Sequence, residues 1–296
     1  MTIGYRTTEN LNGSGGAARH AGDSLLLLDR GVSRHQQARI DAAIQTYYED
    51  LFDEDTRLTT RSAQGRLEFE RTQEIVRAAT PAPARLLDVG GATGIHAAAL
   101  ARDGYEVTLI DPVPGQVATA RKYGTFEALV GDARTLDLTD GSFDAVLMAG
   151  PLYHLAARRD RVRALSEGRR VCRADGFVHA AAIPRMSAIA VAVLDWDVLN
   201  PAPEAVMDLI RHGDPAAGRF PAGHFHTAEE LHEELTDAGL RNVTVVGLEG
   251  PAGMALETVD DVSQEDFSAA KRLAFMFQSS PQIRDYSCHL LGTGQV

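Results

Sequence analysis

Three acidic residues occupy equivalent places in this sequence, at the ends of successive apolar runs. Asp88 precedes the glycine-rich run 90–94, Asp111 ends the second apolar run, and Asp132 follows the third. Glycines let the backbone approach a ligand where a side chain would collide. A carboxylate at the end of the second strand of an α/β sheet can accept both hydroxyls of a ribose, and Asp132 could accept from an adenine amino group. The three acids together predict a nucleoside site.

The elements that must position these acids follow from the alternation of apolar runs with helical patterns. We expect strands at 85–89, 106–110, 127–130, 143–149 and 176–182, and helices from 94, near 115–123 and near 158–173. Further on, the pattern predicts helices at 228–239 and 264–277 and strands at 243–247 and 287–291. This order predicts an α/β fold with a doubly wound, mostly parallel, seven-stranded sheet. Ligands bind such sheets beyond the carboxyl ends of the strands.

The remaining segments divide the chain into three parts. We expect a flexible arm at 1–22, an N-terminal helical cap at 23–83 and the main domain at 84–296. The cap should contain a helix from His35 to the acidic cluster 49–55 and a second helix at 67–79. An insertion at 184–226, after the fifth strand, has its own apolar face. We expect it to form a lid together with the first helix of the cap.

Composition excludes several classes of function. The formal net charge is −12, whereas nucleic acids and anionic membranes are bound through clustered Lys and Arg, so neither partner is expected. Cys172 and Cys288 are expected to be reduced packing residues. The apolar run 25–28 is too short for a signal peptide or a membrane span. The sequence therefore predicts a cytoplasmic protein and leaves its oligomeric state open.

The run Asp88-Val89-Gly90-Gly91-Ala92-Thr93-Gly94 resembles the first motif of the S-adenosylmethionine-dependent methyltransferases with a Rossmann-like (class I) fold, with Ala92 in place of the middle glycine. Asp111-Pro112-Val113-Pro114, Gly131-Asp132-Ala133 and 143–148 fall where that family has its ribose, adenine and fourth-strand motifs. The resemblance covers roughly residues 35–296. It implies that S-adenosylmethionine is the cofactor and S-adenosylhomocysteine the product. The cofactor site predicted in this way comprises Asp88, Gly90, Gly91, Thr93, Gly94, Asp111, Pro112, Gln116, Asp132, Ala133 and Ala149, with Arg71 for the methionine carboxylate unless that arginine lies in solvent.

The segment Gly150-Pro151-Leu152-Tyr153-His154-Leu155 follows the fourth strand. It resembles the corresponding stretch of bacterial methyltransferases that act on small molecules, often in specialised (natural-product) metabolism. Enzymes that methylate amino groups of nucleic acid bases have Asn or Asp where this chain has Gly150, and the acidic metal ligands of catechol-type enzymes do not follow Val146. His154 is the predicted general base, because histidine titrates near neutral pH; capping or packing is the alternative.

Contacts to the methyl acceptor are predicted for Tyr47, Tyr48, Tyr153, Trp196, His224 and His226. For the tyrosines the alternative is core packing, and for the two histidines it is surface exposure. No metal site is expected, because no third ligand accompanies the His-x-His pair. The acceptor should be a small, apolar or aromatic molecule, and the sequence leaves open whether oxygen, nitrogen or carbon is methylated.

Two other classes of function compete with methyl transfer. The run 90–96 imitates the glycine turn of NAD(P)-dependent short-chain oxidoreductases, but no Tyr-x-x-x-Lys pair occurs and about 85 residues precede the turn. A non-catalytic cofactor-binding protein is the other alternative. The acids at 88, 111 and 132 and the apolar insertion favour the methyltransferase.

Overall fold

The computed structural model describes residues 34–48, 56–194, 203–215, 220–259 and 261–296. All of them belong to one compact unit. The predicted arm at 1–22 and Trp196 lie outside the described residues.

The centre of this unit is a seven-stranded sheet with the order β3-β2-β1-β4-β5-β7-β6. Its strands are β1 (Arg85–Val89), β2 (Glu106–Asp111), β3 (Glu127–Val130), β4 (Phe143–Met148), β5 (Cys172–Ala182), β6 (Arg241–Gly247) and β7 (Leu290–Gln295). The first five pair in parallel, whereas β7 is antiparallel to both of its neighbours. The predicted mostly parallel, seven-stranded sheet is therefore confirmed.

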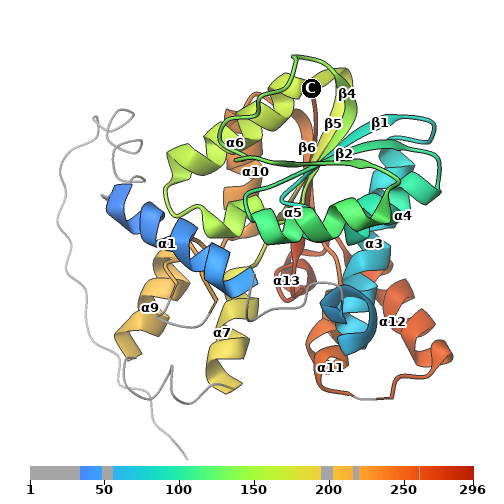
Figure 1. Ribbon diagram of the computed structural model, residues 1–296. Helices are drawn as coiled ribbons and strands as arrows, with labels where there is room; N and C mark the ends of the chain where they lie inside the picture. Colours follow the sequence, from blue (N-terminus) through green and yellow to red (C-terminus); the bar gives the residue numbers. More distant parts are fainter. Residues whose placement is uncertain (1–33, 49–55, 195–202, 216–219, 260) are drawn as a thin grey trace, which may run out of the picture. The chain divides into compact units, whose positions relative to one another are not determined.

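Helices cover both faces of the sheet, which explains why its central strands are apolar on both sides. On one face pack α3 (Ala63–Ala79), α4 (Ile95–Arg102) and α5 (Pro114–Ala120), with Val76, Leu100 and Val117 against Leu86 and Leu109. On the other face (Figure 1), α6 (Arg158–Val171) and α10 (Ala228–Asp237) place Leu165, Leu231 and Leu235 against Val146 and Val178. Successive side chains of each central strand point alternately into these two cores. Packing on both faces thus fixes the strands whose carboxyl ends form the ligand-binding edge of the sheet.

Additional helices surround that edge. They are α1 (Arg34–Thr46), α7 (Arg185–Leu194), α9 (Pro203–His212), α11 (Gly253–Thr258), α12 (Gln264–Phe277) and α13 (Pro281–Arg284). In its described residues, 184–194, 203–215 and 220–226, the insertion contains two helices that the sequence did not predict, because prolines and glycines interrupt its apolar pattern. It returns to the sheet where His226 donates its backbone N–H to the carbonyl of Ile183 (3.0 Å).

Several predicted boundaries change in the structure. The helix α3 begins at Ala63 rather than near 67, because the Ser62 hydroxyl caps it by accepting from the backbone N–H of Gly65. The last strand begins at Leu290 rather than at 287, because Ser287 is fully buried and its hydroxyl accepts from the backbone N–H of Glu249 (2.8 Å). Thr227 and Glu230 form a capping box at the start of α10, and both cysteines are free and buried, as expected. Within the described parts of the chain, no helix is long and apolar enough to cross a membrane.

Candidate active site

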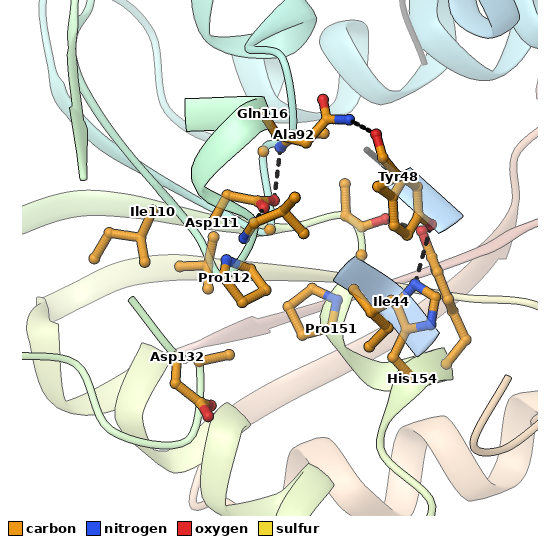
Figure 2. A pocket seen from close by; sticks show the side chains of 18 of the residues that line it. Ile44, Tyr48, Ala92, Ile110, Asp111, Pro112, Gln116, Asp132, Pro151 and His154 are labelled. Atoms are coloured by element: carbon orange, nitrogen blue, oxygen red, sulfur yellow. Dashed lines mark hydrogen bonds between the residues drawn. The ribbon is translucent and has the colours of Figure 1, made fainter. Parts of the chain in front are cut away.

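A cavity of about 250 Å³ opens at the carboxyl ends of the first four strands (Figure 2). Residues that follow each strand line it: Val89–Ala92 after β1, Ile110–Val113 after β2, Gly131–Arg134 after β3 and Ala149–Pro151 after β4. This is the edge at which α/β sheets bind their ligands. Of the predicted cofactor residues, the cavity wall contains Gly90, Gly91, Asp111, Pro112, Gln116, Asp132, Ala133 and Ala149.

The glycine turn brings bare backbone to the cavity wall. Gly90 has φ +72°, and a Cβ built on it would lie 2.8 Å from the Cδ of Pro151. Ala92, at the place of the family's middle glycine, also takes a positive φ of +47°. This conformation costs an L-residue about 1–2 kcal/mol. The backbone N–H of Ala92 donates to Asp111 Oδ2 at 2.9 Å, which holds the turn in place.

Asp111 is fixed by two backbone donors. Besides Ala92, the N–H of Val113 donates to Asp111 Oδ1 at 2.9 Å. Each carboxylate oxygen has further lone pairs, and the residue lies at the cavity wall beyond β2. This is the position from which a carboxylate accepts the two ribose hydroxyls of a nucleoside. The bare turn and the oriented Asp111 together fit the ribose and methionine portions of S-adenosylmethionine.

Asp88, Thr93 and Gly94, also predicted to bind the cofactor, do not line this cavity. Asp88 is fully buried beneath the turn, and a Cβ on Gly91 would approach its Oδ2 to 2.7 Å. Burial, together with the charge of Asp111, raises the pKa of Asp88 to about 7. The structure therefore gives Asp88 a role in supporting the turn instead of direct contact with a ligand in the cavity.

Asp132 lies at the cavity but is engaged by an arginine. Its carboxylate accepts from the Nε of Arg134 at 2.9 Å and from the backbone N–H of Arg134 at 2.8 Å. Burial would raise the pKa of Asp132, but the hydrogen bonds from Arg134 outweigh it and lower the pKa. The same guanidinium reaches Asp41 on α1 at 3.0 Å. An adenine amino group would have to share this carboxylate with Arg134.

The helix α1 covers the cavity and is tied to its rim by polar side chains. Gln37 donates to the carbonyl of His154 at 3.1 Å and accepts from the backbone N–H of Ala156 at 2.9 Å. Gln45 donates to the carbonyl of Pro112 at 2.9 Å. At the end of the helix, the amide of Gln116 donates to the carbonyl of Tyr48. These contacts hold α1 over the ends of β2 and β4.

His154 is held as a neutral base. Its Nδ1 lies 2.8 Å from the carbonyl oxygen of Pro221, which can only accept, so Nδ1 carries the proton. Nε2 therefore has a lone pair available and accepts from the hydroxyl of Tyr48 at 3.1 Å (Figure 2). Burial lowers the pKa of His154 to about 4. The imidazole is thus unprotonated at neutral pH.

Aromatic rings surround this imidazole. The centroid of His154 lies 4.8 Å from that of Tyr153, 5.2 Å from that of Phe220 and 5.7 Å from that of Tyr48. Tyr47 continues the cluster, 5.8 Å from Phe220 and 5.1 Å from Tyr48. Phe220 and Pro221 come from the insertion, so the insertion contributes to this side of the site.

Four other predicted residues, Tyr47, Arg71, His224 and His226, do not line the cavity. Arg71 is buried and donates to Glu74 (3.1 Å) and Gln278 (2.5 Å), so the structure does not bring it to the cavity where the methionine carboxylate was expected. His226 is fully buried against the carboxylate of Glu234 (3.2 Å), and His224 lies 3.4 Å from Glu230. These two histidines are anchored to α10 and are neither surface residues nor part of the cavity wall.

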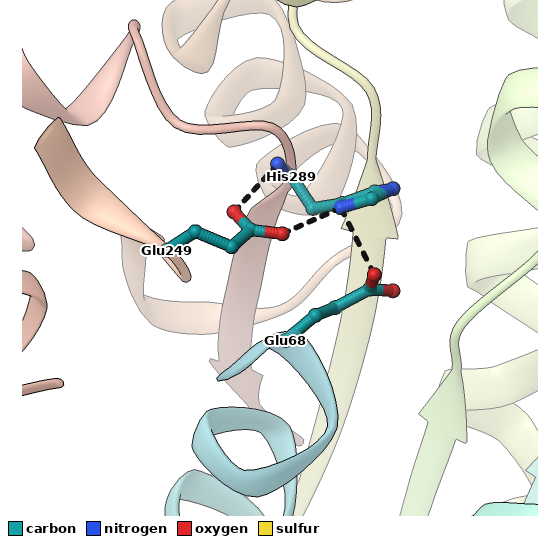
Figure 3. A group of neighbouring side chains, drawn as sticks. All are labelled: Glu68, Glu249 and His289. Atoms are coloured by element: carbon teal, nitrogen blue, oxygen red, sulfur yellow. Dashed lines mark hydrogen bonds and ion pairs between the residues drawn. The ribbon is translucent and has the colours of Figure 1, made fainter. Parts of the chain in front are cut away.

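The sequence missed a charged group that also lines the cavity. Arg57, Glu68 and His96 line it, and Arg57 makes a bidentate pair with Glu68 (2.6 and 3.1 Å). His289 lies 3.3 Å from Glu68 and 2.7 Å from Glu249 (Figure 3). No local motif marks these residues, because α3, the turn after β6 and the start of β7 meet only in the folded chain.

This group is an ion-pair network with its charges balanced. Burial alone would lower the pKa of His289, but the carboxylates of Glu68 and Glu249 outweigh it and raise the pKa. Arg57 lowers the pKa of Glu68 to about 2 against the effect of burial. Glu249 also accepts from Gln64 at 2.8 Å. Two carboxylates thus face the guanidinium of Arg57 and the imidazole of His289, whose protonated form they favour.

Comparison with known proteins agrees with this geometry. Residues 87–180 match the methyltransferase domain family. The chain is 33% identical over 184 residues to a malonyl-[acyl-carrier protein] O-methyltransferase of Geobacter sulfurreducens, covering 60% of this chain and 63% of that one. It is 40% identical over 93 residues to a demethylmenaquinone methyltransferase of Beutenbergia cavernae, covering 31% and 38%. The chain thus spans less than two thirds of the length of these curated relatives.

A solved structure has the same fold. It is a Thermotoga maritima protein described as an S-adenosylmethionine-dependent methyltransferase, possible histamine N-methyltransferase. The two share a TM-score of 0.54 at 19% identity, over 88% of this chain and 99% of that one.

The sheet order is that of a Rossmann-like domain, and the glycine turn and the oriented Asp111 lie at its ligand-binding edge. Residues 87–180 match the methyltransferase domain family, and S-adenosylmethionine is the cofactor that this match implies. The comparisons agree with the class and cofactor expected from the sequence, the fold is confirmed, and the oxidoreductase alternative is not retained.

Proposed function

We propose that this protein transfers the methyl group of S-adenosylmethionine to a small, apolar or aromatic molecule held beside His154. The observation that carries the proposal is that one cavity is lined both by Gly90 and Asp111 and by His154. The resemblance of 150–155 to methyltransferases of specialised metabolism supports an acceptor from natural-product biosynthesis.

In this proposal each cofactor-binding residue contacts one part of S-adenosylmethionine and so fixes the position of its methyl group. Asp111 accepts the ribose hydroxyls, and the backbone at Ala133 borders the adenine. The bare turn at Gly90 accommodates the methionine portion. Arg57, a guanidinium that lines the cavity and is paired with Glu68, replaces Arg71 as the predicted partner of the methionine carboxylate, which would have to share it with Glu68.

The bound cofactor supplies an electrophilic methyl group on a sulfonium. The site aligns the acceptor for in-line displacement, and such positioning can supply about 7–11 kcal/mol of the barrier. His154 Nε2 takes the proton of the acceptor as the new bond to carbon forms. Such general-base help contributes about 10²–10⁴ in rate. The carbonyl of Pro221 keeps the imidazole in the tautomer that this step needs.

The N-terminal cap and the insertion are proposed to enclose the acceptor. The segment directly after α1 supplies Tyr48, and the insertion supplies Phe220 and Pro221, all in contact with the ring of His154. Exclusion of water from this space would strengthen the hydrogen bonds around the base.

The proposal is tested with cofactor whose methyl group is deuterated. The purified protein is incubated with this cofactor and small-molecule extracts, and labelled products are sought by mass spectrometry together with S-adenosylhomocysteine. We expect labelled products that Asp111→Ala protein does not form. If wild-type protein yields neither labelled product nor S-adenosylhomocysteine above the variant's background, the proposal is wrong.

A further inference from the structure

The hydroxyl of Tyr48 occupies the position in which a methyl acceptor would have to meet the base. Nε2 is the only nitrogen of His154 that can receive a proton, because Nδ1 donates to the carbonyl of Pro221. Tyr48 places a phenol hydroxyl 3.1 Å from that Nε2, and both residues line the cavity. A phenol therefore already fits the geometry that general-base catalysis needs in this site.

The surroundings of this contact suit an aromatic ring. The ring of Tyr48 stands edge-on to His154, at an interplanar angle of 87°. Tyr153 and Phe220 pack against the other sides of the imidazole with centroids 4.8 and 5.2 Å away. Edge-to-face pairs of this kind contribute about 0.5–1.5 kcal/mol beyond the area that they bury.

The contact can also be exchanged without unfolding α1. The backbone carbonyl of Tyr48 is held by Gln116, and the helix is held by Gln37 and Gln45, so none of these ties involves the phenol ring. Rotation about the side-chain torsions of Tyr48, against its edge contact with Tyr47, would remove the hydroxyl from Nε2 without breaking these ties. A ligand that offers the same hydroxyl and a similar ring would restore the lost hydrogen bond.

We propose that the methyl acceptor presents an aromatic hydroxyl, which displaces the Tyr48 hydroxyl from His154 Nε2, so that the product is an aryl methyl ether. The inference rests on the proposed function. In the step, a lone pair of the phenolic oxygen forms the bond to the methyl carbon, and the bond from that carbon to sulfur breaks with its electron pair going to sulfur. The phenolic proton passes to Nε2. The carboxylate of Asp41 is the anionic group that favours the resulting imidazolium.

The first test identifies the linkage in the labelled product of wild-type protein by nuclear magnetic resonance. A deuterated methyl on an aromatic oxygen supports the inference. A methyl ester, a methylamine or a methyl on carbon overturns it and leaves the proposed function intact. Absence of any labelled product and of S-adenosylhomocysteine would instead refute the proposed function itself.

The second test measures displacement directly, without catalysis. Calorimetry on protein saturated with S-adenosylhomocysteine compares 1-naphthol with naphthalene. In Tyr48→Phe the internal competitor is gone, and one hydrogen bond contributes about 0.5–1.5 kcal/mol net. We therefore expect 1-naphthol to bind about 2- to 12-fold more tightly than to wild type, with no such gain for naphthalene.

The matched control is Tyr286→Phe, which removes the hydroxyl of an exposed tyrosine that does not line the cavity. It should leave both affinities at their wild-type values. His154→Gln should abolish the preference for naphthol over naphthalene in the Tyr48→Phe background. Equal affinities of wild type and Tyr48→Phe for 1-naphthol would overturn the displacement.

Discussion

Replacing Asp111 by Asn should weaken cofactor binding while the fold is retained. In the wild type both carboxylate oxygens accept backbone N–H groups, from Ala92 and Val113, each at 2.9 Å. In Asp111→Asn one oxygen becomes an NH₂ group, which must face either a backbone donor or a ribose hydroxyl. A hydrogen bond to a charged group contributes about 1.5–3 kcal/mol. We expect the dissociation constant of S-adenosylhomocysteine to rise about 10- to 150-fold, since 1.4 kcal/mol corresponds to a factor of ten.

Titration calorimetry measures this change, and circular dichroism with thermal unfolding establishes that the variant is folded. The matched control is Asp144→Asn, on β4. That carboxylate also accepts a backbone N–H, from Arg85 at 2.7 Å, but does not line the cavity. The Asp144→Asn protein should bind S-adenosylhomocysteine with the same affinity as the wild type. If Asp111→Asn binds as tightly as Asp144→Asn, the assignment of Asp111 to the ribose is refuted.

Three further predictions concern stability and the turn. His289→Gln removes an imidazolium whose pKa lies above 6.5; the stability that it contributes is present below pH 6.5 and is lost as pH rises through the raised pKa. The free energy of unfolding, measured with urea, should therefore differ less between wild type and variant as the pH rises. A difference that stays constant with pH would contradict this. Glu234→Gln leaves Arg161, which is 3% exposed, without its anionic partner, and should lower the free energy of unfolding by about 3–5 kcal/mol; a loss below about 1 kcal/mol would show that the pair is dispensable. Gly90→Ala places a Cβ 2.8 Å from Pro151 at a positive φ, so both the melting temperature and the affinity for S-adenosylhomocysteine should fall, and unchanged values would count against so close an approach of Gly90 to Pro151.

The sheet and the cofactor edge followed from the sequence because their signals are local. Apolar runs alternating with helical patterns predict parallel strands, and an acid at a strand end must lie at the carboxyl edge. Asp111 was therefore placed correctly. Asp88 was predicted to touch the ligand, but the sequence does not show that the turn folds over its carboxylate and buries it.

The other side of the site depends on contacts between distant segments. Arg57 and Glu68 reach the cavity because α3 packs near the turn after β6, a meeting that no sequence spacing reveals. Arg71 lies only three residues beyond Glu68, but its side chain is taken up by Glu74 and Gln278. The proton on His154 Nδ1 likewise depends on Pro221, 67 residues further along the chain.

The most direct test of the central claim is calorimetry of the wild-type protein with S-adenosylhomocysteine and, separately, with NADPH. The arrangement of the glycine turn and Asp111 predicts saturable binding of S-adenosylhomocysteine with one site per chain and no saturable heat with NADPH. Binding of NADPH without binding of S-adenosylhomocysteine would contradict the assignment of this cavity to a methyltransferase.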